Sequence, residues 1–412
     1  MNCDRSTNAK AKILIIICAL VYFVSYLTRY SYNSNIVAIT DYYKINNATA
    51  GFVCTLYFFS YGIGQIVHGL LCKKYNPKYI IPFVLAVSAV INIIAFYKPP
   101  FFVFKYLWFI NGAVLSVLWS LLIKTISDNI PDGLVNFSAV VMSIPVVAGT
   151  VVAYGGSALF NFWGNFSISF ITSAILAIII GSFWLFLYDK FVFKSNVSES
   201  VSVRESEIDV NNRGKKGFIF LLVLLGIYSA IAALIRDGLN TWMPQILKTE
   251  YDFSDSISLV LTLVLPMLGF FGCFLGVFFN KKIKDYVTVC AIIFSIMIVC
   301  LFSVILSAKK SFVIMVISFG VLSLLSHTVT NVTTSLFPMK NGGYINSGLV
   351  AGLLNGSCYT GSTLSAYGLG YISDKFGWNK VFFLLFSCAV FALLSAIIYI
   401  IVKNIKKKRY LY

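Results

Sequence analysis

The stretch from Lys12 to Asn33 reads KILIIICALVYFVSYLTRYSYN and determines the fold class of the chain. Its length matches the roughly 20 apolar residues that a helix needs to cross the hydrocarbon core of a bilayer. The stretch contains no small-residue cleavage site, so we interpret it as a retained membrane span rather than a signal peptide. Arg29 is its one charged residue after Lys12. An arginine at the centre of a span costs about 2.5–3.5 kcal/mol, and such residues usually face a protein interior or an aqueous cavity.

The rest of the chain has the same apolar character. Of its 412 residues, 59% are hydrophobic and 11% are charged, whereas soluble domains carry about 25% charged residues. This composition excludes an ordinary soluble domain, a disordered chain and a small disulfide-stabilised fold. We predict an all-α membrane protein with twelve transmembrane helices. They lie near residues 13–36, 48–71, 79–97, 101–124, 134–160, 166–188, 217–247, 257–279, 286–307, 312–336, 345–372 and 381–402.

The net charge of +17 reflects membrane topology rather than nucleic-acid binding. Most Lys and Arg residues fall in segments on the side of the N-terminus, in clusters such as Lys73-Lys74, Lys281-Lys282 and Lys406 to Arg409. Cytoplasmic segments of membrane proteins carry such an excess of positive charge. We therefore predict a multi-pass protein of the plasma membrane with both termini in the cytoplasm and no nucleic-acid partner.

The chain divides at its centre into two related halves. Its longest polar stretch, residues 189–216, is predicted to be a cytoplasmic linker between an N-terminal six-helix half, 1–188, and a C-terminal half, 217–412. Shifting the sequence by 207 positions places residues of one half on identical residues of the other. The pairs are Arg29 with Arg236, Asn33 with Asn240, Gly62 with Gly269, Gly69 with Gly276 and Gly149 with Gly356. Their agreement on one offset predicts an internal duplication and two pseudo-symmetric halves.

A polar stripe runs along the first predicted span. Tyr22, Tyr26, Arg29 and Asn33 are spaced by four, three and four residues, which places them on one helical face. In the seventh span, Ser229, Ala233, Arg236 and Asn240 repeat this spacing with smaller side chains. Under the pseudo-twofold symmetry, the two arginines are expected to approach each other across a central cavity.

Acidic residues are scarce inside the predicted spans. Of the 15 Asp and Glu residues, only Asp237 lies within one. Consecutive helical residues point about 100° apart, so we expect Asp237 to contact another helix or the outer end of its span rather than Arg236. Two arginines without matching carboxylates then define an anion site, since guanidinium groups suit phosphate and carboxylate oxygens. A purely structural role, with the arginines bonded to carbonyls or tyrosines, is the alternative.

Glycines and prolines mark expected packing contacts and bends. Gly348, Gly352 and Gly356 form a G-x-x-x-G-x-x-x-G face on the eleventh span, which predicts close approach of a neighbouring helix. Pro145 and Pro266 lie inside the fifth and eighth spans, where we expect bends.

Two loop motifs resemble the G-x-x-x-D-[RK] signature of the major facilitator superfamily. They are Gly69-Leu70-Leu71-Cys72-Lys73-Lys74 and Gly276-Val277-Phe278-Phe279-Asn280-Lys281. Lys73 and Asn280 stand where the superfamily has an acidic residue, so the resemblance implies a weaker charge contact at this loop. It also implies the superfamily fold, in which two six-helix halves rock around a site near the bilayer midplane.

Over nearly its whole length, the chain resembles the organophosphate:phosphate antiporters, which include the glycerol-3-phosphate and hexose-6-phosphate transporters. The resemblance rests on the stretches 26–29, 61–65, 236–242 and 370–378. It implies that Arg29 and Arg236 bind the substrate phosphate. The aromatic residues that it implies along the translocation path are Tyr22, Tyr26, Tyr61 and Trp119.

Three departures from the family imply a less positive site. Gln65 and Tyr30 stand where well-known members have lysines, and Pro145 stands where the glycerol-3-phosphate type has a histidine. A smaller anionic charge or a different organic anion is therefore compatible with the resemblance.

The sequence thus predicts a monomeric secondary transporter that exchanges a phosphate ester, such as a sugar phosphate or glycerol phosphate, for inorganic phosphate by alternating access. The scarcity of titratable residues in the spans, with Asp237 and a weaker candidate in His327, favours exchange over proton symport. The alternatives are a non-transporting sugar-phosphate receptor, an exporter of amphipathic cations and an organic-anion or carboxylate porter. No motif predicts an enzyme, a catalytic residue, a bound metal or a cofactor. The predicted substrate-binding residues are Arg29, Arg236, Tyr26, Tyr22, Asn33, Asn240, Tyr61 and Trp119.

Overall fold

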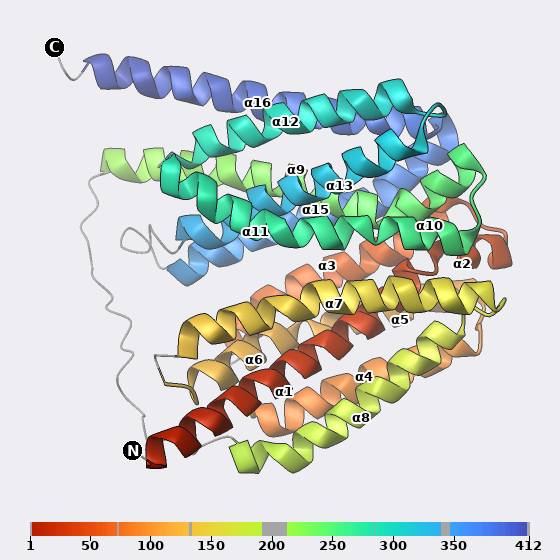
Figure 1. The fold of residues 1–412 in the computed structure, drawn as a ribbon. Coiled ribbons are helices and arrows are strands. Elements are labelled where there is room, and N and C mark those ends of the chain that lie inside the picture. The colour runs from red at the N-terminus through yellow and green to blue at the C-terminus, as the bar shows by residue number, and fades with distance from the viewer. Residues whose placement is uncertain are drawn as a thin grey trace. The chain divides into compact units, whose positions relative to one another are not determined.

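The computed structural model describes residues 2–71, 74–131, 134–191, 212–283, 285–338 and 347–409, and all regular elements in these ranges are helices (Figure 1). The first half contains α1 (Asn2–Asn33), α2 (Ile36–Tyr43), α3 (Asn47–Leu71), α4 (Pro77–Phe96), α5 (Phe101–Leu115), α6 (Val117–Ser127), α7 (Val135–Phe162) and α8 (Ile168–Phe191). The second contains α9 (Asn212–Tyr251), α10 (Asp255–Thr262), α11 (Val264–Lys282), α12 (Tyr286–Ser307), α13 (Phe312–Asn331), the π-helical turn η3 (Val332–Leu336), α15 (Ser347–Phe376) and α16 (Trp378–Arg409). A helix satisfies its own backbone hydrogen bonds, which a chain in lipid requires. The all-α prediction is confirmed.

Eleven helical segments of the described residues are long and apolar enough to cross a membrane. They coincide with eleven of the twelve predicted spans. The remaining prediction, residues 345–372, falls on α15, which is 30 residues long. Its sequence is rich in Gly, Ser and Thr, and these residues lower its hydropathy below that of the other spans. The hydropathy of α15 therefore indicates a membrane span less clearly than its length does.

Three predicted spans each consist of two helices. The fourth is divided between α5 and α6 at Ser116, the tenth between α13 and η3, and the eighth between α10 and α11 at Leu263. Pro266 explains the third division, because a proline ring clashes with the carbonyl four residues earlier, here Thr262, the last residue of α10. The helical segment is interrupted at Leu263, three residues before Pro266, whereas α7 continues as one helix through Pro145, and the bends expected at both prolines stay predictions.

The chain forms two compact units. The first contains Met1–Lys44, Leu56–Val203 and Asp255–Val260, and the second contains Ile45–Thr55, Arg204–Ser254 and Leu261–Tyr412. Two short pieces, 45–55 and 255–260, thus belong to the unit opposite to the predicted half. Shifting residues 48–53 by 207 positions gives 255–260, so the two pieces occupy equivalent places in the duplicated sequence. The exact limits of the halves and of the linker stay predictions, because residues 192–211 lie outside the described ranges.

Helix packing is similar in the two units. In the first, α1 packs against α7 and α8, and α4 packs against α8 (Figure 1). In the second, α9 packs along α15, α11 along α13 and α12 along α16. Of the two loop motifs, Cys72 and Lys73 lie outside the described residues, as do the surroundings of Gly69 and Asn280. The weakened loop contact therefore stays a prediction.

The close approach of a neighbouring helix that was predicted for the glycine face of α15 is not found at Gly352, the central glycine of that face. A Cβ added to Gly352 would meet no atom of the described residues within 4 Å, so no described helix approaches it closely, and the surroundings of Gly348 lie outside the described residues. The close approach occurs at Gly361 instead. A Cβ there would collide with the carbonyl oxygen of Ala230 on α9 and would lie 2.7 Å from its carbonyl carbon. Spacing of small residues cannot distinguish these positions, because only the facing backbone decides which glycine is needed.

An ion pair joins the ends of two helices at equivalent places in each unit. Lys78 on α4 pairs with Asp189 on α8, and Lys403 on α16 pairs with Asp285 at the start of α12. The 207-residue shift places Lys78 on Asp285, so the two pairs have opposite charge order. Both pairs are partly exposed, and exposed pairs contribute only about 0–1 kcal/mol.

Asp285→Ala is expected to lower the stability of the second unit by about 1 kcal/mol, because Asp285 also caps α12 by accepting a hydrogen bond of 3.1 Å from the Thr288 backbone N–H. Desolvation raises the pKa of the Asp285 carboxyl, but hydrogen bonds from Lys403 and Thr288 outweigh it and lower the pKa below its ordinary value. The contribution is therefore present above the unfolded-state pKa and is lost as pH falls through the folded-state pKa. Thermal unfolding in detergent at several pH values measures it. Lys403→Met, which removes only the ion pair, is the control and should cost less. Equal losses in both variants would contradict the capping role.

Candidate functional site

The predicted aromatic stripe on α1 is present in the first unit. The Tyr22 and Tyr26 rings lie 5.2 Å apart, and the Tyr22 ring lies 5.0 Å from the ring of Trp119 on α6. The guanidinium carbon of Arg29 lies 5.5 Å from the centre of the Tyr26 ring. Tyr22, Tyr26 and Arg29 therefore share one helical face, as their spacing predicts, and this face meets a half-buried tryptophan from another span.

Arg29 lies in a cage of aromatic rings. Its side chain is buried, with 9% of the residue exposed. The distances from its guanidinium carbon to the ring centres are 5.2 Å for Tyr57 and Tyr61, 5.3 Å for Tyr30, 5.4 Å for Phe58 and 5.5 Å for Tyr26. Each ring face attracts a cation by about 0.5–2 kcal/mol, depending on solvent exclusion. Because the rings carry no net charge, this aromatic cage stabilises the guanidinium without neutralising it.

Three members of the aromatic cage, Tyr30, Tyr57 and Phe58, were not predicted to contact Arg29. Tyr57 and Tyr61 stand four residues apart on α3, and their rings stack at 5.7 Å. That spacing was a usable signal, because it places two phenols on the same face of the second span. The adjacent Tyr30 and Phe58 could not be found in this way, since their contact with Arg29 depends on how α1 and α3 pack.

The backbone beside Arg29 is fixed by buried amides. The carbonyl of Thr28 accepts hydrogen bonds of 3.3 Å from the side-chain amides of both Asn92 on α4 and Asn111 on α5. Ser31 donates to the Asn92 side-chain oxygen at 2.6 Å. Inside a membrane span, such interhelical hydrogen bonds satisfy polar groups that lipid cannot. They hold α1 in place and so set the position of Arg29.

The Tyr57 hydroxyl is a buried polar group that has no hydrogen-bond partner among the described residues. Tyr57 is 3% exposed, and its hydroxyl oxygen has no hydrogen-bond partner in the described part of the chain. Buried polar groups are normally hydrogen-bonded, and an unsatisfied one costs about 1–3 kcal/mol. This hydroxyl belongs to a ring that touches Arg29. A phenol donor and a guanidinium are therefore carried side by side in the first unit.

Arg236 has a different environment in the second unit. Its Nε donates to Asp237 Oδ1 at 2.8 Å and its Nη2 donates to Asp237 Oδ2 at 3.0 Å. Ser362 on α15 donates a short hydrogen bond to the same Oδ2. The expectation that Arg236 lacks a matching carboxylate is wrong. Neighbouring residues do leave the helix in different directions, but the long arginine side chain bends around to reach the short aspartate.

Asp237 does contact another helix, through Ser362, but the expectation that it does so rather than pairing with Arg236 is wrong. The other residues of the second stripe have mixed surroundings. Ser229 donates to Thr333 of η3 at 2.6 Å, which is a packing contact, and Asn240 is half-buried one turn after Arg236. Asn33 is buried at the end of α1. Substrate contacts of Asn33 and Asn240 stay predictions. So does the convergence of Arg29 and Arg236, which belong to different units.

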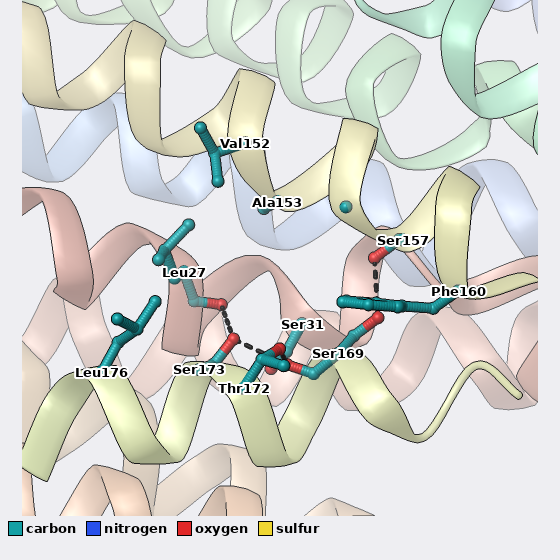
Figure 2. Close-up of a pocket in the computed structure, with 11 residues that line it drawn as sticks. Leu27, Ser31, Val152, Ala153, Ser157, Phe160, Ser169, Thr172, Ser173 and Leu176 are labelled. Carbon is teal, nitrogen blue, oxygen red and sulfur yellow. Dashed lines mark hydrogen bonds between the residues drawn. The ribbon is translucent and has the colours of Figure 1, made fainter.

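A cavity of about 210 Å³ opens in the first unit between α1, α7 and α8 (Figure 2). Ser157 and Ser169 hydrogen-bond across it at 3.1 Å, and Ser173 donates to the Leu27 carbonyl at 3.3 Å. Its hydroxyl groups thus serve helix packing, and its lining is otherwise mostly apolar. None of the predicted substrate-binding residues lines it, so we do not assign the substrate to this cavity.

The sequence matches the family model of the Major Facilitator Superfamily over residues 18–366. The chain belongs to this superfamily. It is therefore an integral, multi-pass membrane protein with the fold of a membrane transporter, and its natural partners are a small molecule and membrane lipid.

Two curated relatives are both named membrane sensor protein UhpC. The protein from Escherichia coli (strain K12) is 27% identical over 93 residues, which cover 23% of this chain and 21% of the relative. The protein from Salmonella typhimurium is 26% identical over 99 residues, covering 24% and 22%. The match spans about a fifth of the relatives' length.

Three solved structures share the fold across nearly the whole chain. A bacterial homolog of the human lysosomal transporter Spinster, inward-facing and occupied, has a TM-score of 0.73 at 14% identity, covering 95% of this chain and 94% of the other. The nucleoside transporter NupG has a TM-score of 0.71 at 15% identity, with 95% and 98% coverage. The POT family transporter PepTSo has a TM-score of 0.73 at 12% identity, with 97% and 99% coverage. At such identities the likeness concerns the fold alone.

Proposed function

We propose that this chain is a secondary transporter that exchanges an organic anion, most suitably a phosphate ester such as a sugar phosphate or glycerol phosphate, for inorganic phosphate. It acts as a monomer in the plasma membrane, with both termini in the cytoplasm, and by alternating access. The observation that carries the proposal is the buried guanidinium of Arg29 within its aromatic cage.

The chemistry of the aromatic cage favours an anion over a cation. A cationic substrate would meet a fixed positive charge, whereas phosphate oxygens accept the planar pair of N–H donors that a guanidinium offers. The rings hold the charge in a buried place, where it interacts more strongly than in water. The Tyr57 hydroxyl, which has no hydrogen-bond partner among the described residues, supplies a further donor for an anion oxygen. An exporter of amphipathic cations is therefore disfavoured.

The second unit carries little net charge around Arg236. Arg236 is paired with Asp237, so this pair contributes no net charge while it is intact. Gln65 and Tyr30, which stand where the antiporter family has lysines, lower the positive charge further. A carrier with this reduced positive charge suits a phosphate ester in its singly charged form or another small organic anion. A carboxylate porter differs from it only in substrate.

Exchange follows from the same charges. Closing the carrier around a buried guanidinium with no anion bound is costly, and a bound anion lowers that cost. Asp237, the acidic residue predicted inside a span, is engaged by Arg236 and Ser362 rather than standing alone as a proton carrier. We therefore favour exchange of anions over coupling to protons.

Uptake of labelled inorganic phosphate by liposomes containing the purified protein tests this function. We expect uptake to be faster when the liposomes contain phosphate or glycerol 3-phosphate than when they are empty, with no pH gradient imposed. External glycerol 3-phosphate should compete with the label. Uptake that requires a pH gradient and ignores internal anion would contradict exchange, and competition by simple carboxylates but not by phosphate would identify a carboxylate porter.

A non-transporting receptor is the second candidate, because both curated relatives are named membrane sensor proteins. A receptor needs the same buried arginine to bind its ligand but does not carry it across. Phosphate binding measured in detergent, together with no flux in the liposomes, would favour this function over transport.

Tyr57→Phe separates a ligand role of the Tyr57 hydroxyl from a structural one. The hydroxyl makes no hydrogen bond within the described protein, so its removal is expected to leave thermal stability unchanged or slightly raised. If the hydroxyl donates to the anion, phosphate binding should weaken by about three- to tenfold, the equivalent of one hydrogen bond. Tyr30→Phe, which removes a hydroxyl from another ring of the aromatic cage, is the control for general changes to the cage. Lower stability with unchanged binding would contradict the ligand role.

A further inference from the structure

The Arg236, Asp237 and Ser362 side chains form a compact cluster on α9 and α15. Two of the five N–H donors of the guanidinium, one on Nε and one on Nη2, are bound by the two oxygens of the same carboxylate. Asp237 Oδ2 also accepts from Ser362. The arginine side chain is 19% exposed and that of the aspartate 8%. The cation is thus the more accessible partner, and the anion is the more enclosed one.

This geometry matches the way in which a guanidinium binds a phosphate or carboxylate ligand. Two parallel N–H···O bonds to two oxygens of one group are the preferred arrangement for such anions. Asp237 therefore occupies the Nε–Nη2 edge of Arg236 that a substrate would use for bidentate binding. An external anion can take this edge only if the carboxylate leaves it.

The cluster also contains a hydrogen-bond donor, Ser362, for the carboxylate of Asp237 after it separates from Arg236. A buried carboxylate with no partner would be strongly unfavourable. Ser362 lies on a different helix and donates a hydrogen bond to Oδ2 of Asp237. This hydrogen bond can therefore persist when the two hydrogen bonds from Arg236 are broken. The carboxylate therefore keeps the hydrogen bond from Ser362 after it separates from the guanidinium.

We propose that Asp237 is an internal counter-anion, which occupies the Nε–Nη2 edge of Arg236 in the empty carrier and is displaced when the transported anion binds. This inference rests on the proposed function and deepens it. Asp237 then has two effects. It competes with the substrate and so weakens binding, and it neutralises Arg236 in the empty state and so permits the empty carrier to reorient.

The consequence is a carrier that is not restricted to exchange. With Asp237 in place, the wild-type protein should show a slow net efflux of phosphate into anion-free buffer in addition to fast exchange. Without the carboxylate, the charge of Arg236 loses the compensation that Asp237 gives it until an anion binds, and the empty carrier should reorient much more slowly. A permanent structural ion pair predicts the opposite, since its loss would weaken the site rather than strengthen it.

The test compares the wild type with Asp237→Asn, using labelled inorganic phosphate as the probe. We expect Asp237→Asn to bind phosphate at least about tenfold more tightly in detergent. In liposomes, it should lower net efflux relative to phosphate–phosphate exchange by at least about tenfold. Asp237→Glu, which keeps the carboxylate, is the matched comparison, and its ratio should lie closer to that of the wild type than the ratio of Asp237→Asn does. Weaker phosphate binding by folded Asp237→Asn, or an unchanged ratio of efflux to exchange, would overturn the proposal.

Ser362→Ala keeps the proposal testable if Asp237→Asn does not fold. Removing the hydroxyl takes away the hydrogen bond that Ser362 gives to the displaced carboxylate, so phosphate binding should weaken by several-fold while the ion pair itself persists. Unchanged binding in Ser362→Ala would overturn the proposal. Failure of the wild-type protein to exchange phosphate at all would instead contradict the proposed function, so the two failures are distinguishable.

Discussion

Arg29→Ala is expected to weaken the binding of inorganic phosphate and phosphate esters by about two orders of magnitude. Arg29 is buried and held among five aromatic rings, so its bond to an anion is formed largely out of water. Removing one partner of a buried, charged hydrogen-bonded pair costs about 2–5 kcal/mol, and each 1.4 kcal/mol is a factor of ten in affinity. Isothermal titration calorimetry in detergent, or the rise in unfolding temperature on adding phosphate, measures the loss.

Two further substitutions show whether the loss is specific to the shape and place of the Arg29 guanidinium. Arg29→Lys keeps the charge but loses the planar pair of donors, so an intermediate affinity is expected. Lys98→Gln is the matched control, because Lys98 also lies over aromatic rings, 4.9 Å from both Tyr42 and Phe166, but at the end of a span. It should bind phosphate as the wild type does. Wild-type affinity in folded Arg29→Ala would contradict the assignment of Arg29 to the anion.

Gly361→Ala is expected to destabilise the second unit strongly. The added methyl would collide with the Ala230 carbonyl oxygen on α9, and backbone cannot move aside as a flexible side chain can. Overpacking of this kind costs about 1–3 kcal/mol and more where backbone must shift. We expect a fall of several degrees in unfolding temperature and a lower yield of folded protein in detergent.

Gly352→Ala is the matched control for that substitution, since it makes the same chemical change on the same helix. No atom of the described residues lies within 4 Å of the added methyl, and alanine favours helix by up to about 1 kcal/mol over glycine. Its stability should equal or slightly exceed that of the wild type. Equal stability of the two variants would contradict the close packing of α9 on α15 at Gly361.

The membrane architecture could be predicted from the sequence because it depends on run length and hydropathy alone. The breaks inside spans were harder to predict. Pro266 marks one of them by a local clash, whereas Ser116 separates α5 from α6 with no proline nearby. Similarly, Pro145 lies within a continuous α7. A proline therefore indicates where a helix can bend, and packing decides whether it does.

The parts of the candidate site that depend on residue spacing within a single helix could be predicted from the sequence. The face shared by Tyr22, Tyr26 and Arg29 follows from helical periodicity. Contacts between helices did not follow from it, and the contacts of Tyr30 and Phe58 with Arg29 therefore became known only from the packing of α1 and α3. The error at Asp237 has a different origin. Periodicity describes where a side chain leaves the helix, and the reach of an arginine from that point is long enough to pair with its neighbour.

In the proposed function, the buried Arg29 of the first unit binds the anion that the protein carries. The most direct test of this claim is the rate of labelled phosphate uptake into liposomes preloaded with unlabelled phosphate, measured for the wild type, Arg29→Ala and Lys98→Gln at equal amounts of folded protein. We predict rapid uptake by the wild type and Lys98→Gln, and a rate at least about a hundredfold lower for Arg29→Ala. Equal uptake by Arg29→Ala and the wild type would contradict the claim.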